Sequence, residues 1–222
     1  PFGHAGERLL NQIMPGGFEH NQQSLRVVDR LEKDGDGLNL TWEVRNGIVC
    51  HTGETRAATL EGQVVRVSDQ IAYINHDIDD AMRGGIIYPT DIPIHISQRL
   101  GFTHGERINT LVLDVIHASH GEREIRQSAE IGAAMQELRA FMFDEVYTNP
   151  MAKGEEGKAQ EMLRRLFEHY QSHPDELPAE YQDIRLRESV ERAVCDYIAG
   201  MTDSYAVEKS IELFVPKGWT VK

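Results

Sequence analysis

Residues 60–85, LEGQVVRVSDQIAYINHDIDDAMRGG, carry a long and regular apolar pattern. Its apolar residues follow one another at steps of three or four positions. An α-helix has about 3.6 residues per turn, so residues with this spacing form one stripe along its surface. The stripe consists of Leu60, Val64, Val67, Ile71, Ile74, Ile78 and Met82. The pattern therefore predicts one long amphipathic helix that ends at the glycine pair Gly84 and Gly85.

The side of this helix opposite the stripe carries polar residues. Asp69, Tyr73 and Asp77 are spaced i, i+4, i+8 and therefore stack along one line. Two interpretations are open for this face. It is either the solvated acidic side of an amphipathic helix, or a second inward face that lines a metal-containing pocket in a helix bundle. The spacing alone does not separate them.

The rest of the chain also has helical patterns, punctuated by proline and glycine. Besides a turn running into a helix at 1–11, helices are predicted at 18–32, 40–50, 104–119, 122–147, 155–170, 183–202 and 204–214. Alternating strand patterns are nearly absent, and no Walker loop, dinucleotide fingerprint, GxSxG or zincin signature occurs. The predicted fold is all-α, a multi-helix bundle.

Composition limits the class of protein. With 222 residues, 40% hydrophobic and 27% charged, the chain resembles an ordinary soluble globular protein large enough for a sizeable core. It contains no apolar run of about 18 residues, so no membrane span is expected. A net charge of −13 argues against general nucleic-acid binding, which depends on Lys and Arg. A small phosphorylated ligand is still compatible, because a cation and a few arginines can reverse the local charge.

The two cysteines, Cys50 and Cys195, match no metal-binding or redox spacing. They are predicted to be buried thiols in a reducing compartment, and we expect a cytoplasmic protein. Near the start of the chain, His4 and Glu7 are three positions apart and share one face of a helix. By themselves they would be interpreted as an exposed pair on a frayed terminus.

Five segments together give a more specific indication. They are PFGHAGE (1–7), FEHNQQSLR (18–26), HTG (51–53), the segment 60–85 and DYIAGMTDSYA (196–206). In these segments and their order the chain resembles the HD-domain deoxynucleoside triphosphate triphosphohydrolases, in the dGTPase-like branch.

This resemblance implies an all-α HD-domain bundle that hydrolyses a dNTP to a deoxynucleoside and inorganic triphosphate. It implies a divalent metal ion (Mg, Mn or Fe) and a homo-oligomer. Residues 1–150 would be the C-terminal part of the catalytic core, and residues 151–222 a helical extension packed on it.

The resemblance also implies roles for individual residues. His4 would donate a proton to the departing 5′ oxygen, and Glu7 would orient it or help activate water. His20 would contact phosphate oxygens. Tyr73 would pack on the deoxyribose, and Asp77 would accept a hydrogen bond from its 3′-OH.

For the metal, Asp69 matches the last ligand of the family pattern. The early His and the His-Asp pair of that pattern would precede PFGHAGE and are not in this sequence. We therefore expect the chain to be the C-terminal part of a longer enzyme, and to bind metal poorly alone, because one carboxylate cannot hold an ion tightly.

Two other hypotheses remain open. The first is another HD phosphohydrolase, such as a nucleotidase acting on monophosphates, which would release orthophosphate rather than triphosphate. The second is a non-catalytic nucleotide-binding scaffold, which the missing metal ligands favour for this chain. The sequence upstream of Pro1 would separate this scaffold hypothesis from the enzyme hypotheses.

Overall fold

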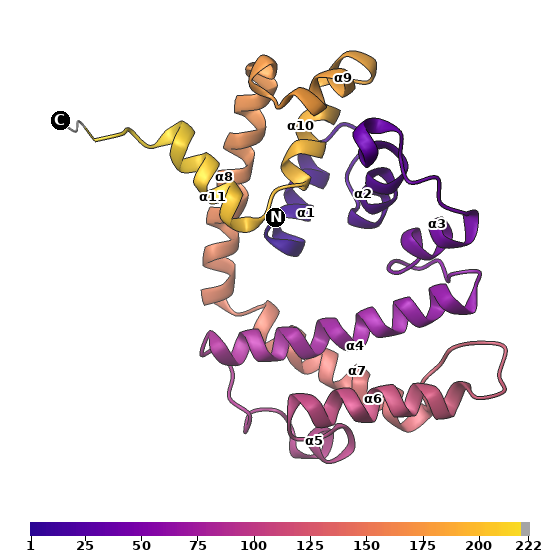
Figure 1. Cartoon of the computed structure of the whole chain (residues 1–222). Coiled ribbons are helices and arrows are strands. Elements are labelled where there is room, and N and C mark those ends of the chain that lie inside the picture. Colours follow the sequence, from indigo (N-terminus) through magenta and orange to yellow (C-terminus); the bar gives the residue numbers. More distant parts are fainter. Residues whose placement is uncertain (219–222) are drawn as a thin grey trace. The chain divides into compact units, whose positions relative to one another are not determined.

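The computed structural model of the chain describes residues 1–218, and all side chains among them except those of residues 150–153. Every regular element in residues 1–218 is helical, which confirms the predicted all-α class (Figure 1). None of these helices is both long enough and apolar enough to cross a membrane. The last residues of the predicted C-terminal extension, 219–222, lie outside the described part.

The chain forms two compact units. Unit 1 comprises residues 1–37 and 154–222, and unit 2 comprises residues 38–153. The predicted boundary at residue 150 lies near the second of these division points. The first 37 residues, however, belong to the same unit as the C-terminal helices. The assignment of a catalytic core to residues 1–150 stays a prediction.

Both units consist of helices and short helical turns. Unit 1 contains α1 (Gly3–Ile13), α2 (His20–Arg26), a π-helical turn (Val27–Leu31), a 3₁₀ turn (Lys33–Gly35), most of α8 (Pro150–Ser172), a second 3₁₀ turn (Pro174–Glu176), α9 (Ala179–Arg187), α10 (Val190–Ala199) and α11 (Asp203–Phe214). Unit 2 contains α3 (Trp42–Val49), α4 (Leu60–Arg83), α5 (Ile94–Leu100), α6 (His104–Ser119), α7 (Ala129–Met142) and a π-helical turn (Phe143–Tyr147).

The long helix α4 has the predicted ends. At its start, Thr59 Oγ1 accepts a hydrogen bond from the Gly62 amide at 3.1 Å, which satisfies one of the N-terminal donors. At its end, Gly85 has a φ of +68°. The Gly85 amide donates to Met82 O at 3.1 Å, and the Ile86 amide donates to Ala81 O at 2.9 Å. This is a Schellman motif, so the predicted glycine cap is confirmed.

The apolar stripe of α4 is buried over most of its length. Ile71, Ile74 and Ile78 belong to the core of unit 2, whereas Leu60 and Val64 are each 44% exposed. In the first turns of α4 the stripe therefore lies outside the core. There the buried residues are Gly62 and Gln63, because α4 crosses α3 closely at the glycines of both helices.

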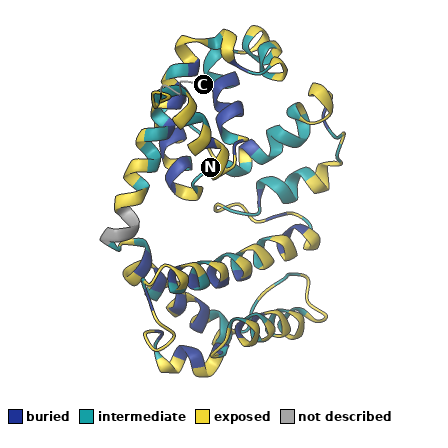
Figure 2. Cartoon of the chain, turned by 60° about the vertical axis from the view of Figure 1, so that its left-hand side comes forward, coloured by how far each residue is buried: buried dark blue, intermediate teal, exposed yellow. Residues whose placement is uncertain are grey.

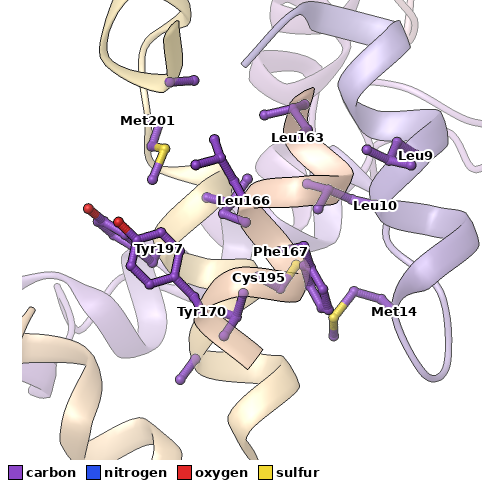
Figure 3. Close-up of a cluster of buried hydrophobic side chains, with 14 of the residues drawn as sticks. Leu9, Leu10, Met14, Leu163, Leu166, Phe167, Tyr170, Cys195, Tyr197 and Met201 are labelled. Atoms are coloured by element: carbon purple, nitrogen blue, oxygen red, sulfur yellow. The ribbon is translucent and has the colours of Figure 1, made fainter. Parts of the chain in front are cut away.

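Unit 1 has its own apolar core (Figures 2 and 3). In Figure 3, Leu9 and Leu10 of α1 lie with Leu163, Leu166 and Phe167 of α8. Both cysteines are buried free thiols, as predicted. Cys195 lies in the core of unit 1, and burial raises the pKa of its thiol to about 12.

Several predicted helices have different bounds in the structure, and the helix predicted at 155–170 is the longer α8 (Pro150–Ser172). The helix predicted at 122–147 begins only at Ala129, because Ser128 Oγ accepts from the Ile131 amide at 3.3 Å and caps it there. The helix predicted at 183–202 is divided into α9 and α10. Ser189 adopts an extended backbone and caps α10 by accepting from the Arg192 amide at 3.0 Å. The helix predicted at 18–32 starts at His20 and finishes in the π-helical turn.

The α3–α4 crossing gives a test of stability. A Cβ added to Gly62 would lie 2.7 Å from Ala57 Cβ and 3.2 Å from Gly47 Cα. Overpacking costs about 1–3 kcal/mol, while alanine gains about 1 kcal/mol of helix propensity. We expect Gly62→Ala to lower the free energy of unfolding by about 1 kcal/mol in urea denaturation.

Gly132 in α7 is the matched control, because its added Cβ would be 3.7 Å from the nearest neighbour, Gln127 Cβ. Gly132→Ala should raise the free energy of unfolding by about 0.5–1 kcal/mol. Equal stabilisation by both substitutions would contradict the close helix crossing.

Candidate functional site

The first group of predicted site residues lies where α1 meets the start of α2. Glu7 Oε1 accepts a hydrogen bond from the backbone amide of His20 at 2.8 Å. The same oxygen lies 2.7 Å from His20 Nδ1. A carboxylate only accepts hydrogen bonds, so Nδ1 carries the proton in this contact. Glu7 thereby fixes the orientation of the His20 ring and directs Nε2 away from itself.

Glu7 also satisfies a backbone donor of α2. His20 is the first residue of that helix, and the first amides of a helix have no partner within it. A negative side chain at this end is also favoured by the helix dipole. The side chain of Glu7 is 24% exposed and that of His20 is 43% exposed. The pair is therefore partly accessible to solvent.

His4 lies one helical turn before Glu7 and is exposed. Burial tends to raise the pKa of Glu7. This effect is outweighed by the two hydrogen bonds from His20 and by the positive charges of His20 and His4, so the pKa of Glu7 is lowered. The structure thus brings together the three residues predicted to carry the chemistry, His4, Glu7 and His20.

Packing of α1 determines which way these side chains face. Its buried residues are Ala5, Gly6, Leu9 and Leu10, so His4 and Glu7 fall outside the core-facing side. A Cβ on Gly6 would be 3.3 Å from Leu163 Cδ1 of α8, which shows how closely the two helices approach. The Phe2 amide donates to Asp203 Oδ1 at 2.8 Å and ties the start of α1 to α11.

The second group of predicted residues lies on α4. Asp69 is exposed, and Tyr73 and Asp77 are half-buried. Asp77 Oδ2 accepts a short hydrogen bond from the hydroxyl of Tyr147, in the π-helical turn after α7. The rings of Tyr73 and Tyr147 stack with their centroids 6.4 Å apart. Burial, followed by the interaction with Asp77, raises the pKa of the Tyr147 hydroxyl.

Tyr147 was not predicted from the sequence. It is 70 positions from Asp77, and its own segment shows no spacing that relates it to α4. The only nearby signal is the π-helical turn, an element that often occurs at functional sites but has no clear sequence signature. Tyr147 adds a second aromatic face beside Tyr73 and holds one oxygen of Asp77.

The two groups belong to different compact units. Unit 1 contains His4, Glu7 and His20, and unit 2 contains Asp69, Tyr73 and Asp77. The joining of both groups into one active site stays a prediction.

The described residues do not form a metal site by themselves. Within them, no three His, Cys, Asp or Glu side chains are grouped so that they could hold an ion. Asp69 can supply one carboxylate oxygen ligand, which suits Mg or Mn, but a single carboxylate does not bind a divalent ion tightly.

Comparison with known proteins gives two kinds of match. Residues 125–211 match the family model of the phosphohydrolase-associated domain. Over 221 residues the chain is 52% identical to a deoxyguanosinetriphosphate triphosphohydrolase-like protein of Caldanaerobacter subterraneus, with 99% of this chain and 65% of that relative covered. A relative with the same description from Geobacter sulfurreducens is 36% identical over 269 residues, covering 97% of this chain and 70% of the relative. The chain thus spans about two thirds of the length of these relatives.

The Glu7–His20 contact gives a prediction about pH. Because the pKa of Glu7 is lowered in the folded chain, its contribution to stability is complete above the unfolded pKa of about 4.3. That contribution is lost as the pH falls through the lower, folded value. Glu7→Gln should reduce the free energy of unfolding by about 1 kcal/mol at about pH 7, and by much less at about pH 3.

Urea denaturation of the unmodified chain and of Glu7→Gln, at pH values from about 3 to about 7, measures the difference in their free energies of unfolding. Glu161→Gln, at an exposed position in the middle of α8 of the same unit, is the control and should leave stability nearly unchanged. A loss of stability in Glu7→Gln that stays the same at all pH values would contradict the ionic contact.

Proposed function

Because this chain belongs to the family of deoxyguanosinetriphosphate triphosphohydrolase-like proteins, we propose that the protein hydrolyses a deoxynucleoside triphosphate, dGTP or a close analogue. The products would be a deoxynucleoside and inorganic triphosphate. The observation that supports this best is the Glu7–His20 contact beside His4. It places two imidazoles and a carboxylate together, and these groups can act as general acids and bases on a phosphate ester.

In the proposed reaction, the oxygen of a water molecule forms a bond to the α-phosphorus, and the bond from that phosphorus to the 5′ oxygen breaks. The departing oxygen takes a proton from His4, and the attacking water gives up a proton to a nearby base, for which Glu7 is the candidate. His20, oriented by Glu7, would hydrogen-bond the phosphate oxygens as charge develops on them. Histidine suits these tasks because its pKa is close to neutrality.

The sugar would bind on the polar face of α4. Tyr147 occupies Oδ2 of Asp77, and a carboxylate has further acceptor positions on its other oxygen. Asp77 Oδ1 would accept a hydrogen bond from the 3′-OH, while the ring of Tyr73 packs against the deoxyribose. A tyrosine ring in this place would leave no room for a 2′-OH and would disfavour ribonucleotides.

Asp69 would contribute one ligand to a divalent metal, whose other ligands would lie outside the described residues. When bound, such an ion would supply stabilisation of negative charge on the phosphate oxygens.

The first test is product identification. The complete protein that carries this chain would be incubated with each dNTP and Mn²⁺, and we expect release of inorganic triphosphate and the deoxynucleoside. His4→Ala and His20→Ala should each lower kcat by about 10²-fold or more, the usual contribution of a positioned acid or base. His173→Ala, at an exposed histidine of the same unit, is the control. Orthophosphate as the product would indicate another HD phosphohydrolase, and no hydrolysis of any nucleotide would indicate a scaffold.

The second test concerns the sugar. Tyr73→Ala should reduce the preference for dGTP over GTP by about tenfold, since the ring that excludes a 2′-OH is removed. The ratio of kcat/KM for the two nucleotides measures this preference. Tyr88→Ala is the control, because Tyr88 is also in unit 2 and is 64% exposed. An unchanged ratio in Tyr73→Ala would exclude Tyr73 from sugar selection.

A further inference from the structure

The carboxylate of Asp196, on α10, is completely buried and has several hydrogen-bond donors. Arg26 Nη2 donates to its Oδ2 at 2.7 Å, and Arg26 Nε lies 2.9 Å from both oxygens. Arg192 Nη2 donates to Oδ1 at 2.7 Å, and Gln23 Nε2 donates to the same oxygen at 2.8 Å. A buried carboxylate needs such partners to remain charged.

Two of these donors, Gln23 and Arg26, are residues of α2, the helix that begins with His20. The network also closes on itself, because Arg192 Nη2 donates to Gln23 Oε1 at 2.6 Å. Arg26 is held further by Glu188, whose Oε1 accepts from Nη2 at 2.8 Å. Asp196 and Arg192 both belong to α10, so these contacts fasten α2 to α10.

Apolar burial contributes little to holding α2 in place. It is seven residues long, and Gln23 is its one buried residue. A helix this short is not stable alone and depends on tertiary contacts. With so little apolar burial, polar contacts such as those to Asp196 are important for its position.

The position of these contacts matters for His20. At about 100° per residue, Gln23 lies about 60° from His20 around the helix axis, and Arg26 a further 60° in the same direction. Gln23 is therefore on the face of α2 next to His20, and Arg26 lies a third of a turn away from His20 on the same rigid helix. Rotation or sliding of α2 that breaks the contacts to Asp196 would also move His20 away from Glu7.

We propose that Asp196 is a positioning residue, which fixes α2 through Gln23 and Arg26 so that His20 meets Glu7. The effect of Asp196 on catalysis rests on the proposed function, in which Glu7 and His20 take part in hydrolysis. The positioning itself is a property of unit 1 and can be measured without substrate.

The substrate-independent experiment follows the Glu7 carboxyl group by NMR during a pH titration. In the unmodified chain the pKa of Glu7 should be below the ordinary value, because His20 donates two hydrogen bonds to it. In Asp196→Asn these donors should move away, and the pKa of Glu7 should rise toward that of an ordinary glutamate. Asp175→Asn is the matched control, since Asp175 forms an exposed ion pair with Arg185 in the same unit.

Arg26→Gln is the second variant, for the case that Asp196→Asn does not fold. It leaves Arg192 and Gln23 on the buried carboxylate, while it removes the bidentate link to α2. The pKa of Glu7 should again rise. A folded Arg26→Gln or Asp196→Asn protein whose Glu7 titrates as in the unmodified chain would overturn the proposal.

In the complete active protein, Asp196→Asn should lower kcat about tenfold or more with a smaller change in KM, because misplaced groups slow the chemical step. If the unmodified protein releases no triphosphate while the Glu7 titration shifts as expected, the proposed function fails and the positioning role stands. If triphosphate is released and neither kcat nor the titration responds to Asp196→Asn, the positioning role fails alone.

Discussion

A single carboxylate oxygen of Glu7 links the two N-terminal helices of the chain. It accepts from both the backbone amide and the imidazole of His20. The backbone contact satisfies an amide that the helix itself cannot satisfy, and the side-chain contact determines which ring nitrogen is presented outward. Local structure and chemistry therefore depend on the same atom. A displacement of α2 would lose the helix cap and the ring orientation together.

The helices that present the two predicted groups are held in different ways. α4 is long, and Ile71, Ile74 and Ile78 are buried in the core of unit 2. Burial of such side chains contributes about 1.5–3 kcal/mol each, so α4 is a rigid support for Tyr73 and Asp77. α2 buries only Gln23 and is held by charged hydrogen bonds. Such contacts are directional, so they fix the orientation of α2 as well as its position.

Much of the fold followed from local sequence signals. α6 has the predicted bounds, and α4 was predicted to within a residue because its periodicity and its glycine cap both act locally. The helix starts at Ser128 and Ser189 were missed, since a serine within a helical pattern was not interpreted as an N-cap. At the site, the shared face of His4 and Glu7 followed from their spacing, but their roles came from a family resemblance. The Tyr147–Asp77 and Arg26–Asp196 contacts join residues 70 and 170 positions apart, and no periodic pattern relates such residues.

The net charge of −13 is compatible with a phosphorylated ligand because some of the carboxylates are paired with donors of the chain itself. The carboxylates of Glu7, Asp77 and Asp196 each accept hydrogen bonds from the chain itself, so their negative charge is already partly compensated. Asp69 differs, because it is exposed and lies outside any cluster of three or more metal-ligand residues among those the structure describes. Within unit 1, the charge of the Glu7 carboxylate beside His4 and His20 is thus already partly compensated by the donors on His20. The local pairing of charges therefore bears on the choice of ligand more directly than the overall net charge does.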